Sequence, residues 1–108
     1  MGHLINMKRK LISDTDVIEI AKALADPNRL TIYTQIANCE EMYCQEMVTK
    51  NGITHSTLSH HLKILSEVGL VKSRKAGLNK YYRAVPAKFA AFVSYMNDIA
   101  ETSKQNNR

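Results

Sequence analysis

The sequence has no long apolar run, no internal repeat and only two cysteines among its 108 residues. A membrane-spanning helix needs roughly 18 or more consecutive apolar residues, and the N-terminal segment lacks the apolar centre and cleavage site of a secretory signal. We therefore expect a cytoplasmic protein without membrane contact. In that compartment two cysteines are expected to be free thiols rather than a structural disulfide.

The motifs of common catalytic sites are missing too. The sequence has no glycine-rich phosphate loop, no nucleophile elbow and no closed set of metal ligands, so we expect no enzyme activity and no cofactor. With 44% apolar residues and a net charge of +5, the composition is typical of one small globular domain with a polyanionic partner. We expect this domain at residues 14–102, between a flexible extension (1–13) and a disordered tail (103–108).

The most informative segment is ITHSTLSHHLKILSEVGLV, residues 53–71. Leu58, Leu62 and Leu65 recur with the period of a helix that packs one apolar stripe on a core. The pattern predicts an amphipathic helix over about residues 55–68, ending just before a glycine.

The opposite face of this helix carries short polar and basic side chains. Ser56, Ser59, His60 and Lys63 fall within roughly 100° of one another on the helical wheel. Hydroxyls and an imidazole near a helix N-terminus can hydrogen-bond base edges, and a lysine one turn later can bind a phosphate. This predicts a DNA-reading helix, with an ordinary solvated face as the alternative. His61 lies at the apolar edge, where we expect a packed, hydrogen-bonded histidine rather than a base contact.

Three helices are predicted before the reading helix, over residues 14–25, 27–38 and about 44–49, and Asn51-Gly52 makes the turn that follows the third. A short helix, a glycine turn and a longer helix make a helix-turn-helix layout. The expected N-caps are Ser13, Asp26 and Thr54. The residues expected on the apolar faces are Val17, Ile18, Ala21 and Leu24 in the first helix and Leu30, Tyr33, Ile36 and Ala37 in the second.

After the reading helix the pattern becomes extended, at residues 70–75 and 80–85, with the turn at 76–79. This hairpin contains basic side chains and no acid, so it is predicted to be a wing that binds phosphates or enters the minor groove. Charge that protects an exposed edge from aggregation is the alternative. The cations are Lys72, Arg74, Lys75, Lys80 and Arg83.

Pro86 opens a last helix that we expect to end near Thr102, with apolar residues at a spacing typical of a core or an interface. A small domain often gains burial by oligomerising, so we expect the two terminal helices to pack across a two-fold axis. Such a dimer would present two reading helices roughly 34 Å apart to a palindromic operator in double-stranded DNA. The expected interface residues are Val17, Ile18, Ala21, Phe89, Phe92, Val93 and Met96.

The chain resembles the ArsR/SmtB winged-helix repressors of bacteria over about residues 17–96. The strings that carry the likeness are ALADPNRLTIY (23–33), STLSHHLKIL (56–65), EVGLVKSRKAG (67–77) and KYYRA (80–84). We expect a mainly α fold with five helices and a two-stranded wing. The resemblance implies a homodimeric transcriptional regulator, usually a repressor that leaves its operator on sensing a signal. The alternative is a winged-helix module whose basic face binds an acidic protein.

By position, the resemblance also implies which side chains meet DNA. The base-reading positions fall on His55, Ser56, Thr57, Ser59 and His60, with Lys63 on the backbone and Arg74 and Lys75 on the wing. Leu78 stands where relatives often place an arginine, so a strong contact from the wing tip is not expected.

The sensor is a separate question. Many metal-sensing relatives carry Cys-x-Cys at positions that here hold Tyr43 and Gln45, and another family site needs histidines that the last helix lacks, so no metal site is expected. Cys39 and Cys44 remain as a possible sensor, near enough for a disulfide, although neighbouring glutamates are expected to raise their pKa. We favour inert packing, and a thiol switch or a cysteine-led metal site are the alternatives.

Overall fold

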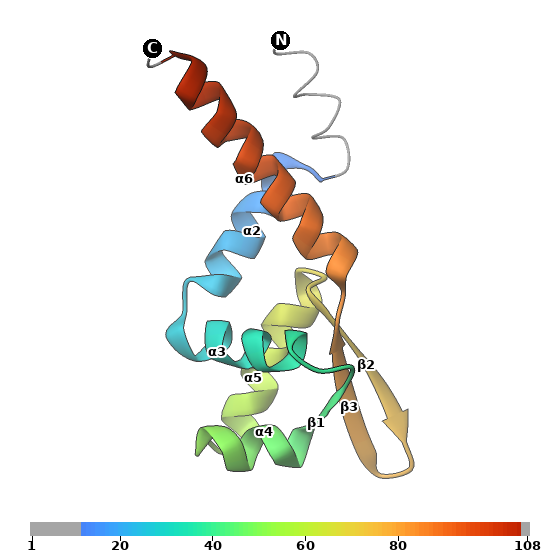
Figure 1. Ribbon diagram of the computed structural model, residues 1–108. Helices are drawn as coiled ribbons and strands as arrows, with labels where there is room; N and C mark the ends of the chain where they lie inside the picture. Colours follow the sequence, from blue (N-terminus) through green and yellow to red (C-terminus); the bar gives the residue numbers. More distant parts are fainter. Residues whose placement is uncertain (1–11, 107–108) are drawn as a thin grey trace.

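The computed structural model describes residues 12–106, so residues 1–11 of the expected extension and residues 107–108 of the expected tail lie outside it. Within this range five helices and a small sheet confirm the predicted winged helix-turn-helix (Figure 1). In order, the elements are α2 (Asp14–Leu24), α3 (Pro27–Ala37), β1 (Met42–Tyr43), α4 (Cys44–Asn51), α5 (His55–Glu67), β2 (Val71–Ala76), β3 (Asn79–Ala84) and α6 (Pro86–Asn106).

The sheet has three strands rather than the two expected. β2 and β3 form the predicted hairpin, and β1 joins β3 in the antiparallel order β1-β3-β2, with Met42 opposite Tyr82. A strand of two residues has no alternation that a sequence pattern could reveal. Because Met42 and Tyr82 are both buried, the extra strand closes the base of the hairpin against the core.

Side-chain caps start three helices at the expected residues. Ser13 and Asp26 accept from backbone N–H groups of the first helical turn at 2.9 to 3.0 Å. The Thr54 hydroxyl accepts from the Thr57 N–H at 3.1 Å. Such caps contribute about 1 kcal/mol each. The cap on α5 also fixes where that helix begins, and so which side chains share each of its faces.

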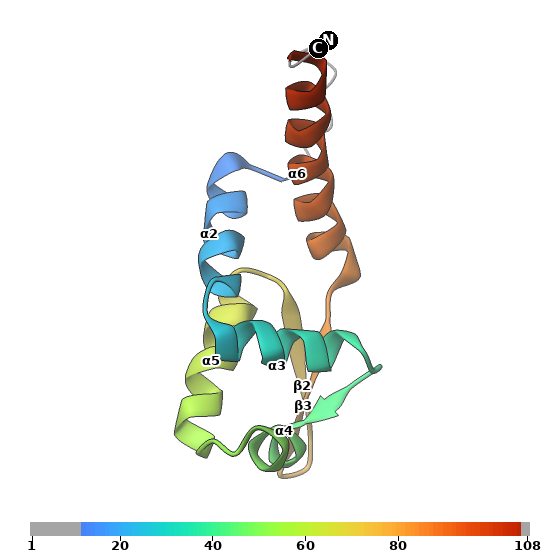
Figure 2. The same ribbon diagram turned by 60° about the vertical axis from the view of Figure 1, so that its left-hand side comes forward.

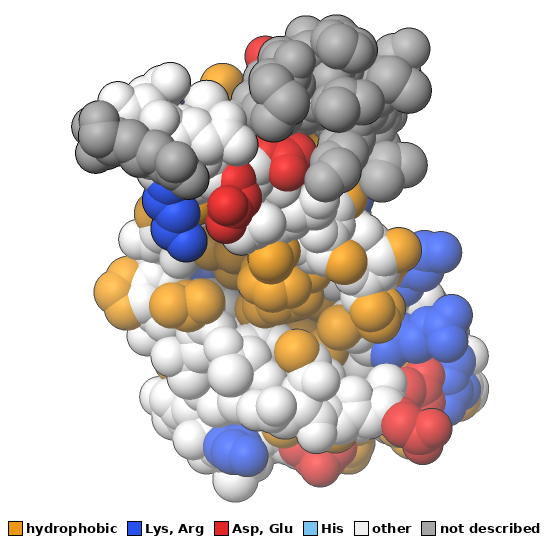
Figure 3. Space-filling model, turned by 45° about the horizontal axis from the view of Figure 1, so that its top comes forward, with side chains coloured by type: hydrophobic (Ala, Val, Ile, Leu, Met, Phe, Trp, Pro, Cys, Tyr) orange, Lys and Arg blue, Asp and Glu red, His pale blue; other side chains and the backbone are white. Residues whose placement is uncertain are grey.

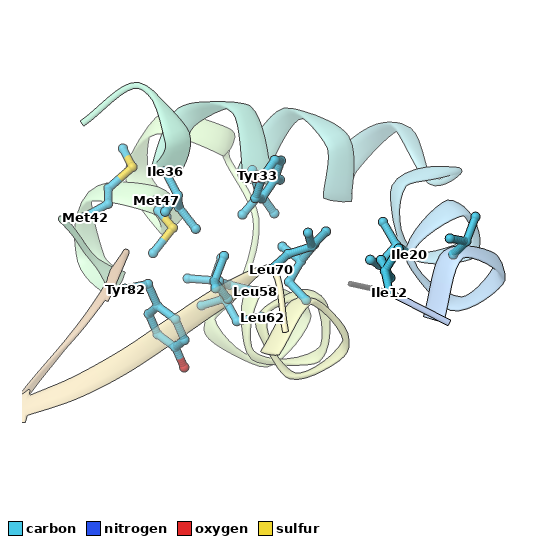
Figure 4. Packing of buried hydrophobic residues seen from close by; sticks show 14 residues of the cluster. Ile12, Ile20, Tyr33, Ile36, Met42, Met47, Leu58, Leu62, Leu70 and Tyr82 are labelled. Carbon is cyan, nitrogen blue, oxygen red and sulfur yellow. The ribbon is translucent and has the colours of Figure 1, made fainter. Parts of the chain in front are cut away.

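The core joins α5 to the helices before it and to the hairpin (Figure 4). Leu58, Leu62 and Leu65 are at most 1% exposed, which confirms the predicted stripe. They belong to one cluster with Ile36 of α3 and Met47 of α4. This packing holds the opposite face of α5 toward solvent.

α2 buries two residues, Ile20 and Ala23, that were not among those expected on its apolar face. Its buried residues are Val17, Ile20 and Ala23, whereas Ile18 is 54% exposed and Ala21 is exposed as well. Two apolar stripes overlap on this helix, and hydrophobicity alone does not say which stripe meets the chain's own core.

The same ambiguity affects α3. Ile32 is buried there together with Tyr33 and Ile36, whereas Leu30 is 48% exposed and Ala37 is exposed. Both helices therefore keep apolar side chains on the outside of the molecule.

α6 leaves the body of the molecule beside α2 (Figures 1 and 2). The Tyr95 hydroxyl donates to the Asp14 carboxylate at 2.7 Å, and the ring centroids of Tyr33 and Phe89 lie 5.4 Å apart. The helix ends at Asn106 instead of near Thr102. No glycine or proline follows Thr102 to end the helix, and Lys104 and Gln105 are good helix formers. None of the described helices is long and apolar enough to cross a membrane.

Candidate nucleic-acid interface

The turn between α4 and α5 is built from Gly52 and a pair of amides. Gly52 has a φ of +61°, in the left-handed region that favours glycine. The Gln35 and Asn51 side chains donate to each other at 2.9 Å in both directions, and Asn51 also donates to the Met47 carbonyl at 2.8 Å. These bonds attach the turn to α3. The amide pair was not identified from the sequence, because its members lie on different helices.

The predicted reading residues lie together on the exposed face of α5, the helix at the lower left of Figure 2. Leu58 and Leu62 point the other way, into the core. The positive end of the helix dipole lies at the same end as this face, which favours an anion there. The six exposed residues are His55, Ser56, Thr57, Ser59, His60 and Lys63.

Three of these six side chains also have partners within the protein. The Ser56 hydroxyl lies 3.4 Å from the Thr54 hydroxyl. The Thr57 hydroxyl accepts from the Thr54 hydroxyl at 3.0 Å, and His55 Nε2 lies 3.0 Å from Gln45 Oε1 on α4. His55 therefore donates through Nε2 in this arrangement. The Ser59 side chain, in contrast, makes no hydrogen bond within residues 12–106 and is free to meet a base edge.

The wing presents its predicted cations to solvent. Lys72, Lys75, Lys80 and Arg83 are all exposed, and Leu78 at the tip is fully exposed. Cations on such an extended hairpin can follow a phosphate backbone without reading its sequence.

Arg74 is the exception, because an acid holds it. Its Nε and Nη2 donate to the two Glu41 carboxylate oxygens at 2.6 and 2.7 Å, and its guanidinium lies 4.6 Å from the Tyr81 ring centroid. The hydrogen bonds lower the pKa of Glu41 and raise the pKa of Arg74. The hairpin has no acid of its own, yet the segment before β1 supplies one. No local pattern could connect residues 33 positions apart.

His61 faces inward and is 6% exposed. Its Nδ1 lies 3.4 Å from Nη1 of Arg29, so the ring accepts a hydrogen bond there. Burial lowers the pKa of His61, Asp26 opposes that effect, and the cations Arg29 and His60 add to it. The expectation of a packed, hydrogen-bonded histidine is confirmed.

Known proteins share this arrangement. A helix-turn-helix domain family matches residues 24–74. The arsenical resistance operon repressor of Staphylococcus xylosus is 33% identical over 94 residues, which cover 87% of this chain and 88% of that protein. The chain belongs to the ArsR/SmtB family of winged-helix transcriptional regulators.

Solved structures agree with this ArsR/SmtB assignment. An ArsR-like transcriptional regulator from Rhodococcus sp. RHA1 shares the fold with a TM-score of 0.76 and 23% identity, over 85% of this chain and 86% of that one. The homodimeric winged helix-turn-helix domain of a possible ArsR-family regulator from Mycobacterium bovis has a TM-score of 0.65 and 30% identity, over 81% and 80%. The chain is a DNA-binding transcriptional regulator.

At the family's metal positions this ArsR/SmtB regulator carries Tyr43 and Gln45. Within residues 12–106 no three His, Cys, Asp or Glu side chains are grouped so that they could hold a metal ion. Cys39 and Cys44 are not bonded to each other. Cys39 is exposed, and its Sγ donates to the Gln35 carbonyl at 3.4 Å.

Burial, rather than the neighbouring glutamates, raises the pKa of Cys44, and the nearby Lys80 opposes it. The acids in question have other roles. Glu46 accepts from the Tyr43 N–H at 3.1 Å, and Glu41 binds the wing arginine. The direction of the expected pKa shift at Cys44 was right and its cause was wrong. A thiol with a raised pKa is less reactive.

α2 and α6 of this regulator carry an exposed apolar face, which we call the α2/α6 face. It contains Ile18 (54% exposed), Ala21, Val93 (47%), Met96 (46%) and Ile99 (48%). Figure 3, in which the top of the molecule is tilted forward, shows hydrophobic side chains gathered in the middle of the surface. The remaining predicted interface residues lie deeper, with Val17 buried and Phe89 and Phe92 half-buried.

Proposed function

We propose that this regulator is a cytoplasmic homodimeric repressor that binds a palindromic operator and leaves it on receiving a signal, without catalysing a reaction. The observation that carries the proposal is the geometry of α5, where polar and basic side chains face solvent directly above a fully buried leucine stripe. Two copies related by a two-fold axis would reach successive major grooves, roughly 34 Å apart.

The α2/α6 face supports the dimer. Its isoleucines, valine and methionine are each about half exposed, and covering exposed apolar surface is favourable. A second copy of the same face is the natural cover under two-fold symmetry. The related Mycobacterium bovis domain is described as homodimeric.

Sequence reading and backbone binding are proposed for different residues. Ser56, Ser59 and His60 would hydrogen-bond base edges, together with His55 and Thr57, which the protein already orients. Phosphates would be bound by Lys63 on α5 and by three lysines of the wing, Lys72, Lys75 and Lys80. Arg74 would also bind a phosphate when it is not paired with Glu41.

DNA binding to the regulator's own promoter region tests the proposal. The double variant Ser56→Ala with His60→Ala is expected to lose about thirtyfold or more in operator affinity, since two base contacts of about 1–3 kcal/mol each contribute at least about 2 kcal/mol together. The control is Thr31→Ala with Thr34→Ala, which removes two exposed hydroxyls that bond only to carbonyls of α3. Salt-independent binding, or equal affinity for both double variants, would contradict the assignment.

The release signal is proposed to act outside the family's metal positions. Cys39 and Cys44 are the candidate sensor residues, but the raised pKa of Cys44 disfavours a thiol switch. We expect hydrogen peroxide to leave operator affinity unchanged in the wild type and in Cys39→Ser with Cys44→Ser, measured by fluorescence anisotropy. Release of the wild type alone would make the cysteines the sensor.

A further inference from the structure

One guanidinium, that of Arg29 on α3, contacts both α2 and α5. Arg29, in the first turn of α3, donates from Nε to the Ala23 carbonyl at 2.7 Å. Its Nη1 lies 3.4 Å from Nδ1 of His61 on α5, and its backbone N–H donates to the Asp26 carboxylate at 3.0 Å. The side chain is part-buried, and within residues 12–106 its hydrogen bonds reach neither the wing nor α4.

The two side-chain contacts join elements with different tasks. Ala23 lies in the last turn of α2, where carbonyl groups have no helical partner and need an outside donor. His61 lies on the buried face of α5, directly behind the reading residues His60 and Ser59. Because the nitrogens of a guanidinium are held in one rigid plane, Arg29 fixes the end of α2 relative to α5.

Packing does not set this spacing by itself. A surface hollow of about 530 Å³ lies beside Arg29, lined by Glu19 and Ala23 of α2 and by Ile64 and Glu67 of α5. Buried side chains such as Ile20 therefore fill only part of the junction between α2 and α5. A polar contact across it therefore has a large influence on the angle between the helices.

We propose that Arg29 is a positioning residue which couples α2, a dimer-interface helix, to the reading helix α5, and so holds the two reading helices of a dimer at the spacing that an operator requires. This rests on the proposed function, because it assumes a dimer that reads DNA. Arg29 acts through Ala23 and His61 and does not itself touch DNA.

Arg29→Lys tests the coupling, because it keeps the charge but replaces the rigid fork with a single nitrogen that cannot reach both acceptors. We expect about tenfold weaker operator binding, with the protein folded and dimeric. The double variant with His61→Leu should bind no more weakly than His61→Leu alone, since the contact is already lost. Anisotropy titrations measure affinity, and sedimentation measures the dimer.

Two controls separate positioning from other roles. Ile36→Val removes a methyl group from a fully buried site on the same helix and shows how much affinity follows from lost stability alone. The salt dependence of binding reports phosphate contacts, and Arg29→Gln should leave its slope unchanged.

Each outcome decides the question. The coupling is supported if Arg29→Lys binds the operator more weakly at an unchanged salt slope. The affinity losses of Arg29→Lys and His61→Leu must also be non-additive in the double variant. Two outcomes would overturn the proposal. If Arg29→Gln reduces the slope of log affinity against log salt by about one, Arg29 is a phosphate ligand. If Arg29→Lys loses no more affinity than Ile36→Val, the role of Arg29 is structural. If the wild type binds no DNA, the proposed function fails first.

Discussion

The reading helix and the wing follow each other in the chain but meet their surroundings in opposite ways. α5 is anchored by three leucines at most 1% exposed and offers mainly uncharged hydrogen-bonding groups. The hairpin is exposed along β2 after Val71 and offers cations. Base edges are recognised by positioned hydrogen bonds, whereas phosphates attract charge at any sequence. The comparison assigns specificity to the anchored helix and general affinity to the wing.

The largest difference is expected when a leucine is truncated in each region. Leu62→Ala removes fully buried atoms from α5 and should lower the free energy of unfolding by about 2–5 kcal/mol. Leu78→Ala, at the fully exposed wing tip, should change it by less than about 0.5 kcal/mol. Urea unfolding measures both. Equal losses would show that the wing tip is packed in solution and would remove the contrast.

The next effect separates affinity from specificity. Lys72→Ala with Lys75→Ala should weaken binding to operator and unrelated DNA alike, and reduce the slope of log affinity against log salt by about 2. Ser56→Ala with His60→Ala should weaken operator binding only, with little change in slope. Titrations at several salt concentrations compare the pairs. A wing variant that loses only operator binding would reverse the assignment of roles.

A smaller effect is expected from the acid that holds the wing arginine. Glu41→Gln removes the negative charge that binds Arg74, so DNA affinity should rise a few-fold and the salt slope should steepen by about one. Glu40→Gln is the matched control, because it removes an adjacent exposed charge that does not bind Arg74. Weaker binding by Glu41→Gln would show that Glu41 positions the wing for DNA.

The smallest effect concerns pH and the anchored helix. Burial lowers the pKa of His61 below 6.5 in the folded state. Above pH 6.5 the His61 imidazole is therefore neutral in both the folded and the unfolded chain, and its contribution to stability is fully present. As the pH falls below 6.5 the unfolded chain takes up a proton before the folded one, and stability declines. His61→Gln should remove this part of the decline, measured by thermal unfolding from pH 7.5 to 5. The exposed neighbour His60→Gln is the control, and an equal change in both variants would rule His61 out.

Local signals allowed most of the fold to be predicted. The caps at Asp26 and Thr54, the leucine stripe of α5 and the basic hairpin are each written within a few neighbouring residues. The burial of Ile20 and Ala23 was not predicted, because a helix with two apolar stripes has two possible inward faces.

The exposed residues of the site could be predicted from the sequence, but the tertiary partners of its side chains could not. Helical periodicity was enough to place Ser59 and His60 outward. The Arg74 pair with Glu41 and the Arg29 contact with His61 join residues about 30 positions apart, and such pairs follow only from the tertiary fold. Those partners decide which cations are free and how α5 is held.

The most direct test is to vary the distance between two half-sites in a palindromic operator and measure the affinity of the purified dimer. The account predicts tightest binding when the half-site centres are one helical turn apart, about 10–10.5 base pairs, and a large loss when five base pairs are inserted, since the second reading helix then faces the wrong side of the duplex. Affinity that does not depend on the spacing, or one monomer bound per half-site without cooperation, would contradict the idea of two coupled reading helices.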